Sequence, residues 1–263
     1  MRALFLSDVH ADGPDDPAQV ALVGWLAQVE ADALYLLGDV FHTWWGYPDA
    51  TFPRYRAVCD ALLDVRRRGV PITLVPGNHD FEAGPFFTEA LGARILPHHP
   101  VSLDGRRLYL AHGDEADQTF GYRLTRLALR GAAFRAGMSA LGPERGLALL
   151  QRLAGASRRA PAPQAWLIAA QRDWAQARVS EGAELVVLGH SHAPGVTPLQ
   201  GGALYNLGDW SQGPRWLRLE DGVPTLEHQA STRASISGSS SSRPAPSTAQ
   251  RLGSSASTTG SSV

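Results

Sequence analysis

At 263 residues with 44% apolar side chains, the chain is long enough to bury one sizeable hydrophobic core. Its 24 basic residues nearly balance its 25 acidic residues, which argues against a general affinity for nucleic acid. All the basic residues are arginine, which excludes a catalytic lysine, and the single cysteine, Cys59, excludes an internal disulfide.

Short and nearly continuous apolar runs recur along the chain, as in strands that are covered on both faces. The first run is too short for a signal peptide, and no apolar stretch approaches the roughly 18 residues of a membrane-spanning helix. We therefore expect a cytoplasmic protein. The runs cover residues 2–7, 33–38, 71–76, 106–111, 183–189, 202–208 and 215–220.

Helical patterns lie between the early runs. Asp16 is a capping residue followed by Pro17, the residue type favoured at the first helical position, and an apolar pattern continues to Val29. A second pattern over residues 53–68 ends in three arginines and a glycine, as the end of a helix favours. This alternation predicts an α/β fold with layered sheets, in which late strands over 202–222 add antiparallel edges.

Residues 115–182 interrupt this alternation with a long helical pattern that is rich in arginine. We interpret this segment as a helical lid insertion within one domain that covers residues 1–230. The Ser-rich sequence over 231–263 predicts a disordered tail. Apolar residues of the insertion recur at spacings of three and four and form one stripe: Leu124, Leu127, Gly131, Phe134, Met138 and Leu141.

Potential metal ligands follow five of the predicted strands at the point where each strand ends. Ligands bind at the carboxyl ends of strands in open α/β sheets, so we expect these side chains to converge on one crevice. A lone Asp-x-His at a strand end is usually a turn or a cap. It is improbable, however, that five strand ends all carry suitable ligand residues by chance. In chain order they are Asp8 and His10; Asp39; Asn78, His79 and Asp80; His112 and Asp114; and His190 and His192.

The set offers imidazole, carboxylate and amide donors but no thiolate, which suits Mn, Fe or Zn. Even seven of these ten side chains would be too many ligands for one tetrahedral zinc ion, and seven fit two neighbouring ions that share a carboxylate. Two such ions activate a water and stabilise the oxygens of an in-line displacement at phosphorus. The pattern therefore predicts a two-metal site for chemistry at phosphate.

The blocks SDVH, GDVF, GNHD, HGD and GHSHAP resemble, in this order, the five signature motifs of the calcineurin-like metallophosphoesterases. The resemblance covers about residues 1–222 and implies a four-layer αββα sandwich, with two packed sheets between helical layers. It also implies a metal-dependent hydrolase in which a hydroxide between two ions is the nucleophile. None of the motif ligands is missing, which argues against a non-catalytic scaffold on the same fold.

The resemblance assigns a role to each matched residue. His79 would be catalytic and act on the transition state or the leaving group, while Asp80 would orient its ring. One metal ion would be held by Asp8, His10, Asp39 and His192, and the other by Asp39, Asn78, His112 and His190.

Three further features resemble one branch of the family, the UDP-2,3-diacylglucosamine pyrophosphatases of lipid A biosynthesis. They are the block LGDWSQGPRWLRLEDG, the tryptophans of GDVFHTWWG and the helical insertion. This branch uses manganese to cleave a UDP-linked lipid to UMP and diacylglucosamine 1-phosphate, with the insertion as a lid over the acyl chains. It implies peripheral contact with the cytoplasmic face of the inner membrane. Substrate contacts are expected from Asn78, His79, Asp117, Tyr122 and Arg123.

Two positions depart from that branch, because His79 stands where it typically carries arginine and His42 where it carries an acid. Arginine offers a fixed fork for phosphate, whereas histidine can donate a proton. Two hypotheses follow: the lipid pyrophosphatase, and a soluble phosphomonoesterase or phosphodiesterase of the same family. The apolar stripe also allows two interpretations, an acyl-binding lid or a helix packed on the protein. No nucleic-acid partner is expected.

Overall fold

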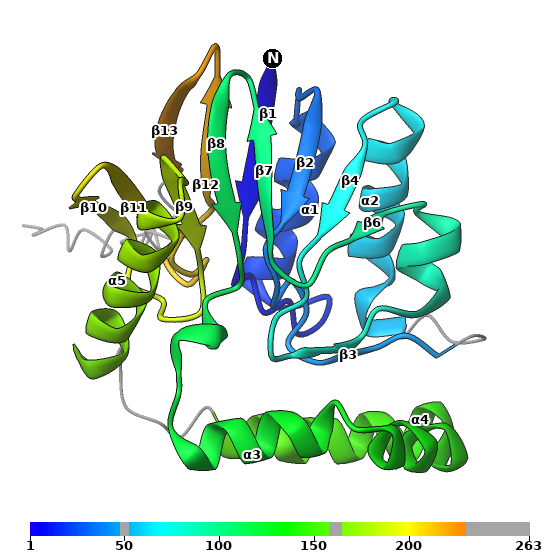
Figure 1. Cartoon of the computed structure of the whole chain (residues 1–263). Coiled ribbons are helices and arrows are strands. Elements are labelled where there is room, and N and C mark those ends of the chain that lie inside the picture. Colours follow the sequence, from blue (N-terminus) through cyan, green and yellow to red (C-terminus); the bar gives the residue numbers. More distant parts are fainter. Residues whose placement is uncertain (48–52, 158–164, 230–263) are drawn as a thin grey trace, which may run out of the picture. The chain divides into compact units, whose positions relative to one another are not determined.

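Two β-sheets form the centre of the computed structural model, which describes residues 1–47, 53–157 and 165–229 (Figure 1). The strands of the first sheet are β1 (Arg2–Leu6), β2 (Ala33–Leu36), β4 (Ile72–Leu74), β6 (Arg94–Ile95), β12 (Arg215–Glu220) and β13 (Val223–His228). They lie in the order β13-β12-β1-β2-β4-β6. β1, β2, β4 and β6 run parallel, while β12 and β13 add an antiparallel edge.

The second sheet contains β7 (His99–Leu103), β8 (Arg106–Leu110), β9 (Leu185–Leu188), β10 (Gly195–Leu199) and β11 (Gly202–Asn206). Its order is β10-β11-β9-β8-β7, with β8, β9 and β11 parallel and an antiparallel strand at each edge. A separate pair joins β3 (Trp44–Trp45) to β5 (Asp80–Glu82). The parallel strands of both sheets therefore bring their carboxyl ends to the loops that carry the predicted ligands.

Alternate side chains of the central strands point into different cores, which explains why their sequences are apolar throughout. In β1, Ala3 and Phe5 belong to the core between the two sheets, whereas Leu4 and Leu6 face the helices. In β9, Leu185 and Val187 likewise belong to the core between the sheets, whereas Val186 and Leu188 pack toward a helix. The fold is thus the expected four-layer αββα sandwich.

Three helices cover the outer faces of the sheets. α1 (Pro17–Gln28) and α2 (Arg56–Arg67) pack on the first sheet, and α5 (Ala165–Ser180) packs on the second. Asp16 caps α1 as predicted, because its carboxylate accepts hydrogen bonds from the backbone N–H groups of Ala18 and Gln19. Short single turns occur at Pro53–Tyr55, Phe86–Ala90 and Asp114–Ala116.

The predicted lid segment contains two helices before α5, namely α3 (Phe120–Leu129) and α4 (Ala132–Ser157). Figure 1 shows them below the ends at which β1, β2 and β4 finish. Gly142, with a φ of 71°, and Pro143 kink α4, because proline removes a hydrogen-bond donor from the helix.

The apolar stripe of the insertion divides into two parts. Met138 is buried in the first core, and Phe134 packs against that core with its ring 5.8 Å from the ring of Trp45. Leu124 and Leu127 of α3 remain 56% and 73% exposed. Phe134 and Met138 of α4 thus pack on the protein, whereas Leu141 of α4 is 40% exposed and the leucines of α3 stay available to another surface.

All seven predicted strands are present, but one detail of the topology is wrong. The segment 202–208 was expected at an antiparallel edge, yet β11 runs parallel beside β9 inside the second sheet. The short or partly polar strands β3, β5, β6, β7, β10 and β13 were not predicted. The predicted tail, 231–263, lies outside the described residues. In the described part of the chain, no helix is long and apolar enough to cross a membrane.

Candidate metal centre

The predicted ligands lie on turns that directly follow strands, and the backbone of these turns is unusual. Asp8, His10, Asp39, His190 and His192 adopt positive φ angles between 51° and 67°. Such angles are uncommon for residues other than glycine and persist where the surrounding structure requires them. The other non-glycine residues with positive φ among those described precede a glycine in hairpin turns. Backbone strain is therefore concentrated at the candidate site.

One group of potential ligands joins the tips of β1 and β9. The Nε2 atom of His192 lies 3.3 Å from Oδ1 of Asp8, and Nε2 of His10 lies 3.8 Å from the same oxygen. The two Nε2 atoms are 3.2 Å apart. Two imidazoles and a carboxylate thus face one point.

A second group surrounds Asp39, whose Oδ2 atom faces both groups. This oxygen lies 3.9 Å from Nε2 of His10 and 3.4 Å from Nε2 of His112. The Nε2 atom of His112 is also 3.1 Å from Oδ1 of Asn78, and its ring centre is 5.1 Å from that of His190. Asp39 therefore occupies the position that a bridging ligand requires.

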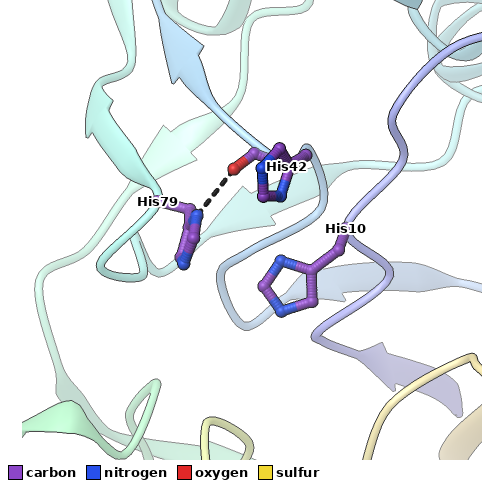
Figure 2. Close-up of side chains that lie close together, drawn as sticks. All are labelled: His10, His42 and His79. Carbon is purple, nitrogen blue, oxygen red and sulfur yellow. Dashed lines mark hydrogen bonds between the residues drawn. The ribbon is translucent and has the colours of Figure 1, made fainter. Parts of the chain in front are cut away.

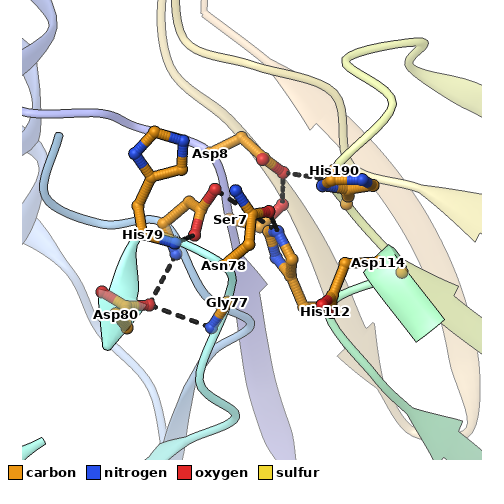
Figure 3. A network of polar contacts seen from close by, with 12 residues as sticks. Ser7, Asp8, Gly77, Asn78, His79, Asp80, His112, Asp114 and His190 are labelled. Atoms are coloured by element: carbon orange, nitrogen blue, oxygen red, sulfur yellow. Dashed lines mark hydrogen bonds and ion pairs between the residues drawn. The ribbon is translucent and has the colours of Figure 1, made fainter. Parts of the chain in front are cut away.

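Hydrogen bonds to the protein hold the other atoms of these ligands in place (Figure 3). Oδ2 of Asp8 accepts hydrogen bonds from the Ser7 hydroxyl (2.6 Å) and from the backbone N–H of His190 (2.8 Å). Nδ1 of His112 donates to the backbone carbonyl of Leu37 (2.8 Å), which leaves Nε2 without a proton when the ring is neutral. This arrangement is typical of metal ligands, whose second polar atom is usually held by the protein.

The ligands carry shifted pKa values, because their charges face one another with little access to solvent. Burial lowers the pKa of His10 to about 3 and, together with the nearby His112, the pKa of His190 to about 4. Both rings are therefore neutral at pH 7, the form in which imidazole binds a metal. Burial opposes charge on Asp8 as well, but contacts with His192 and His112 lower the pKa of Asp8 to about 2.

The pKa of His112 indicates that the site lacks positive charge. Burial alone would lower its pKa, but the carboxylates of Asp39, Asp8 and Asp114 raise the pKa of His112 well above its usual value. A proton on this ring thus compensates part of the negative charge of these carboxylates, of which Asp114 is also paired with Arg126. A metal cation at the same place would remove the need for that proton.

The side chains present fit a pair of divalent cations. Asp8, His10 and His192 form one group in which single ligand atoms all lie within 4.8 Å, and Asp8, Asp39 and His112 form another. Oδ1 of Asp8 is buried and makes no hydrogen bond within the described residues. A buried carboxylate oxygen needs a partner, and a metal ion between the two groups would supply one.

His79 is oriented by a different partner from the one predicted. Its Nδ1 atom donates a hydrogen bond to the backbone carbonyl of His42 (2.6 Å), as Figure 2 shows. Its ring centre lies 4.9 Å from that of His10, and these three histidines form a third group whose ligand atoms lie within 4.8 Å. The tautomer of His79 therefore has its proton on Nδ1 when the ring is neutral.

The prediction that Asp80 orients the His79 ring is wrong. Oδ2 of Asp80 instead accepts hydrogen bonds from the backbone N–H groups of Asp39 (2.7 Å) and Gly77 (3.1 Å). Asp80 therefore ties together the loops that carry Asp39 and Asn78. Its carboxylate thereby supports the backbone at two predicted ligand positions.

Three of the predicted substrate contacts share one cavity. Asp117, Tyr122 and Arg123 line a pocket of about 610 Å³ at α3, whereas Asn78 and His79 do not line it. The pocket is connected to the metal-site loops through Tyr122. Its hydroxyl donates to Asp114 (2.8 Å), and its ring centre lies 6.3 Å from that of His190.

The sequence interpretation missed several residues that support the site. Arg126 and Arg130 of the insertion reach Asp114, at 3.3 Å and 4.0 Å respectively. Ser7 holds Asp8, as described above. No local pattern identifies the two arginines, because they contact residues that are distant in sequence. Ser7 could have been noted as part of the SDVH motif.

Gly77 is expected to tolerate no side chain, because a methyl group there would overlap Oδ1 and Cγ of Asp39. We expect Gly77→Ala to lower phosphoesterase activity by at least about tenfold, since Asp39 or its loop must move. The matched control is Gly24→Ala in α1, where an added methyl group meets nothing within 4 Å. Activity and thermal melting of both variants test this expectation. Full activity of Gly77→Ala would contradict it.

Comparison with known proteins identifies near relatives of the chain. Residues 1–194 match the family model described as calcineurin-like phosphoesterase. The UDP-2,3-diacylglucosamine hydrolase of Stenotrophomonas maltophilia (strain K279a) is 33% identical over 246 residues, which covers 86% of this chain and 98% of that protein. The protein of the same name from Aeromonas salmonicida (strain A449) is 33% identical over 245 residues, covering 87% and 94%. Among solved structures, Yfce, a phosphoesterase from E. coli, is 23% identical with a TM-score of 0.42, covering 86% of this chain and 92% of that chain.

Proposed function

Because this chain belongs to the calcineurin-like phosphoesterase family, we propose that it hydrolyses the diphosphate bond of UDP-2,3-diacylglucosamine. The products would be UMP and diacylglucosamine 1-phosphate, as lipid A biosynthesis requires. The chain is a metal-dependent hydrolase of phosphoester or diphosphate bonds, and the proposal concerns the particular substrate.

The similarity to UDP-2,3-diacylglucosamine hydrolases over nearly their whole length carries this proposal. The match covers 98% of the Stenotrophomonas protein and 86% of this chain, so it is not confined to the short metal motifs. A relationship through the metal motifs alone would indicate only phosphoester chemistry. Similarity over nearly the whole of both chains favours the same class of substrate.

We propose that the site holds two Mn²⁺ ions, with Fe and Zn as the other metals that suit its oxygen and nitrogen donors. When bound, such ions would make a water molecule more acidic and offset the negative charge that develops on the phosphoryl oxygens. Asp39 would be shared between the ions. The remaining ligands would be Asp8, His10 and His192 for one ion, and Asn78, His112 and His190 for the other.

His79 would act beside the ions rather than bind them. Its Nδ1 proton is held by the carbonyl of His42, so the ring is fixed with Nε2 as its free position. A protonated Nε2 would donate a hydrogen bond to a phosphoryl oxygen and stabilise charge in the transition state. UMP and a sugar phosphate are both weak bases as leaving groups, so protonation of the leaving oxygen is of minor importance.

The lipid part of the substrate would lie along α3. Phe120, Leu124 and Leu127 are 82%, 56% and 73% exposed, and each lines the pocket that also contains Tyr122 and Arg123. Apolar side chains beside guanidinium groups suit a ligand with acyl chains and phosphate, or the surface of an anionic membrane. We therefore propose that α3, within the predicted lid segment 115–182, contributes an acyl-binding lid with peripheral membrane contact, whereas α5 of that segment belongs to the sandwich.

A second candidate function is hydrolysis of a soluble phosphate ester. The presence of His79 where lipid pyrophosphatases carry arginine favours this alternative, because histidine can donate a proton to an alkoxide leaving group. An alkoxide leaves when a phosphomonoester or a phosphodiester is hydrolysed. Cleavage of a diphosphate bond instead expels a phosphate group. The two candidates therefore differ in the substrates that His79 would help to cleave.

Substrate competition tests the proposal. We expect the full chain with Mn²⁺ to release UMP from UDP-2,3-diacylglucosamine with a kcat/KM at least about 100-fold above that for UDP-glucose, because only the lipid contacts α3. A generic phosphodiester, bis(p-nitrophenyl) phosphate, serves as the third substrate. Similar kcat/KM values for the phosphodiester and the acylated compound would favour the second candidate.

A further inference from the structure

Arg130 directly follows the last residue of α3. Its side chain contacts two loops that carry predicted ligands of the second metal ion. Its Nη2 atom donates to the backbone carbonyl of Gly77 (3.1 Å) and lies 4.0 Å from Oδ2 of Asp114. Gly77 immediately precedes Asn78, and Asp114 follows His112 by two residues (Figure 3). The guanidinium group therefore contacts the two loops that carry the predicted metal ligands Asn78 and His112.

Arg130 differs from its neighbour Arg126 in how much of its charge is already compensated. Arg126 lies 3.3 Å from Asp114 and 3.6 Å from Glu115, so it pairs with two carboxylates. Oδ2 of Asp114 also accepts the hydroxyl of Tyr122 (2.8 Å). Arg130 is the more distant of the two arginines from this carboxylate, and its side chain remains 35% exposed. Arg126 therefore holds α3 in place, while Arg130 keeps charge and donors for a ligand.

The pocket at α3 gives that ligand a place. Arg130 lines it together with Arg126 and Arg123, which follow one another on the helix at spacings of three and four residues and so share one face. Only Nη2 of Arg130 has a hydrogen-bond partner within the described residues. A guanidinium group carries five N–H donors in a planar fork, so most of them remain for the pocket.

We propose that Arg130 binds the phosphoryl group of the substrate that is not attacked, and so selects diphosphates over single phosphate esters. This inference rests on the proposed function, because a diphosphate places a second phosphoryl group next to the one at the metal ions. A fixed guanidinium group beside the metal ligands matches that second group in charge and in the geometry of its donors. Asp114 and the carbonyl of Gly77 are the groups that position it.

The test compares Arg130→Gln with the wild-type full chain on two substrates in Mn²⁺. Glutamine retains an N–H donor for Gly77 but lacks the charge and the fork. We expect kcat/KM for UDP-2,3-diacylglucosamine to fall about 10- to 100-fold more than kcat/KM for bis(p-nitrophenyl) phosphate, as expected for a lost hydrogen bond to a charged group. Arg130→Lys should restore part of the difference. An equal loss on both substrates, or no loss on either, would overturn the proposal.

Nucleotide binding provides a readout that does not depend on turnover of the lipid. The metal-loaded wild type should bind UDP at least about tenfold more tightly than UMP, and Arg130→Gln should reduce this ratio to about threefold or less. Arg56→Ala, an exposed arginine of α2, is the control for loss of charge. If the wild type does not cleave the lipid substrate but the UDP preference depends on Arg130, the proposed function fails and this inference stands. An unchanged UDP preference in Arg130→Gln would overturn the inference alone.

Discussion

Asp39→Asn is expected to lower kcat/KM by at least about 10³-fold on every phosphate substrate. Oδ2 of Asp39 lies within 3.9 Å of His10 and 3.4 Å of His112, so it is the oxygen that would connect the two ions. Loss of an outer hydrogen-bond partner of a metal site typically costs 10- to 100-fold, roughly, and loss of a shared ligand should cost more. The measurement is steady-state hydrolysis of bis(p-nitrophenyl) phosphate in saturating Mn²⁺.

The choice of asparagine separates charge from shape. Asp39 has a φ of 55°, a conformation that asparagine accepts more readily than alanine does. The amide oxygen can still accept the backbone N–H of His79, which donates to Oδ1 at 2.9 Å in the native protein. Asp60→Asn, on the exposed face of α2, is the control and should retain full activity. Activity of Asp39→Asn within threefold of the wild type would contradict the two-metal account.

A second large effect is expected when the exposed apolar face of α3 is made acidic. Leu124→Asp combined with Leu127→Asp should reduce turnover of UDP-2,3-diacylglucosamine by at least about 100-fold relative to bis(p-nitrophenyl) phosphate. Each leucine is worth about 1.5 kcal/mol when covered by an acyl chain, and each new carboxylate would have to lose its water. Together these terms exceed the roughly 2.7 kcal/mol that corresponds to a 100-fold change. The measurement is the ratio of the two kcat/KM values.

The structure also defines the control for this variant. Phe134 and Met138 contribute to the core, so acidic substitutions there would disturb folding and could not distinguish the hypotheses. Leu124 and Leu127 are exposed, and Val20 of α1 is similarly exposed at 59%. Val20→Asp should therefore leave both substrates unaffected. If the double variant loses activity equally on both substrates, α3 supports the metal site rather than the acyl chains.

The positions of the metal ligands could be predicted because each follows an apolar strand. Parallel strands in a sheet finish at the same edge, so Asp8 and Asp39 meet although they are distant in sequence. The second sheet brings His190 to the same place, where its backbone N–H donates to Asp8. The continuous apolar character of β1 and β9 also indicated sheets covered on both faces, which the alternating cores confirm. For these elements, local pattern and tertiary position agree.

Other features depend on contacts that leave no local pattern. The partner of His79 is a backbone carbonyl, which any residue could supply at position 42, so an acidic side chain at position 80 suggested a different partner. Arg126 and Arg130 belong to the arginine-rich pattern of the insertion, and their contacts with Asp114 depend on the tertiary structure. The strand at 202–206 was expected to form an antiparallel edge with the later strand, but its place beside β9 is set by tertiary packing.

The number of metal ions bound per chain tests the central claim most directly. Native mass spectrometry of the full chain, loaded with Mn²⁺ and freed of excess metal, should detect two ions on the wild type and fewer on Asp39→Asn. This result would support a pair of cations held by the tips of the two sheets around one shared carboxylate. A wild-type chain that binds at most one ion while it hydrolyses phosphate esters at its full rate would contradict the account.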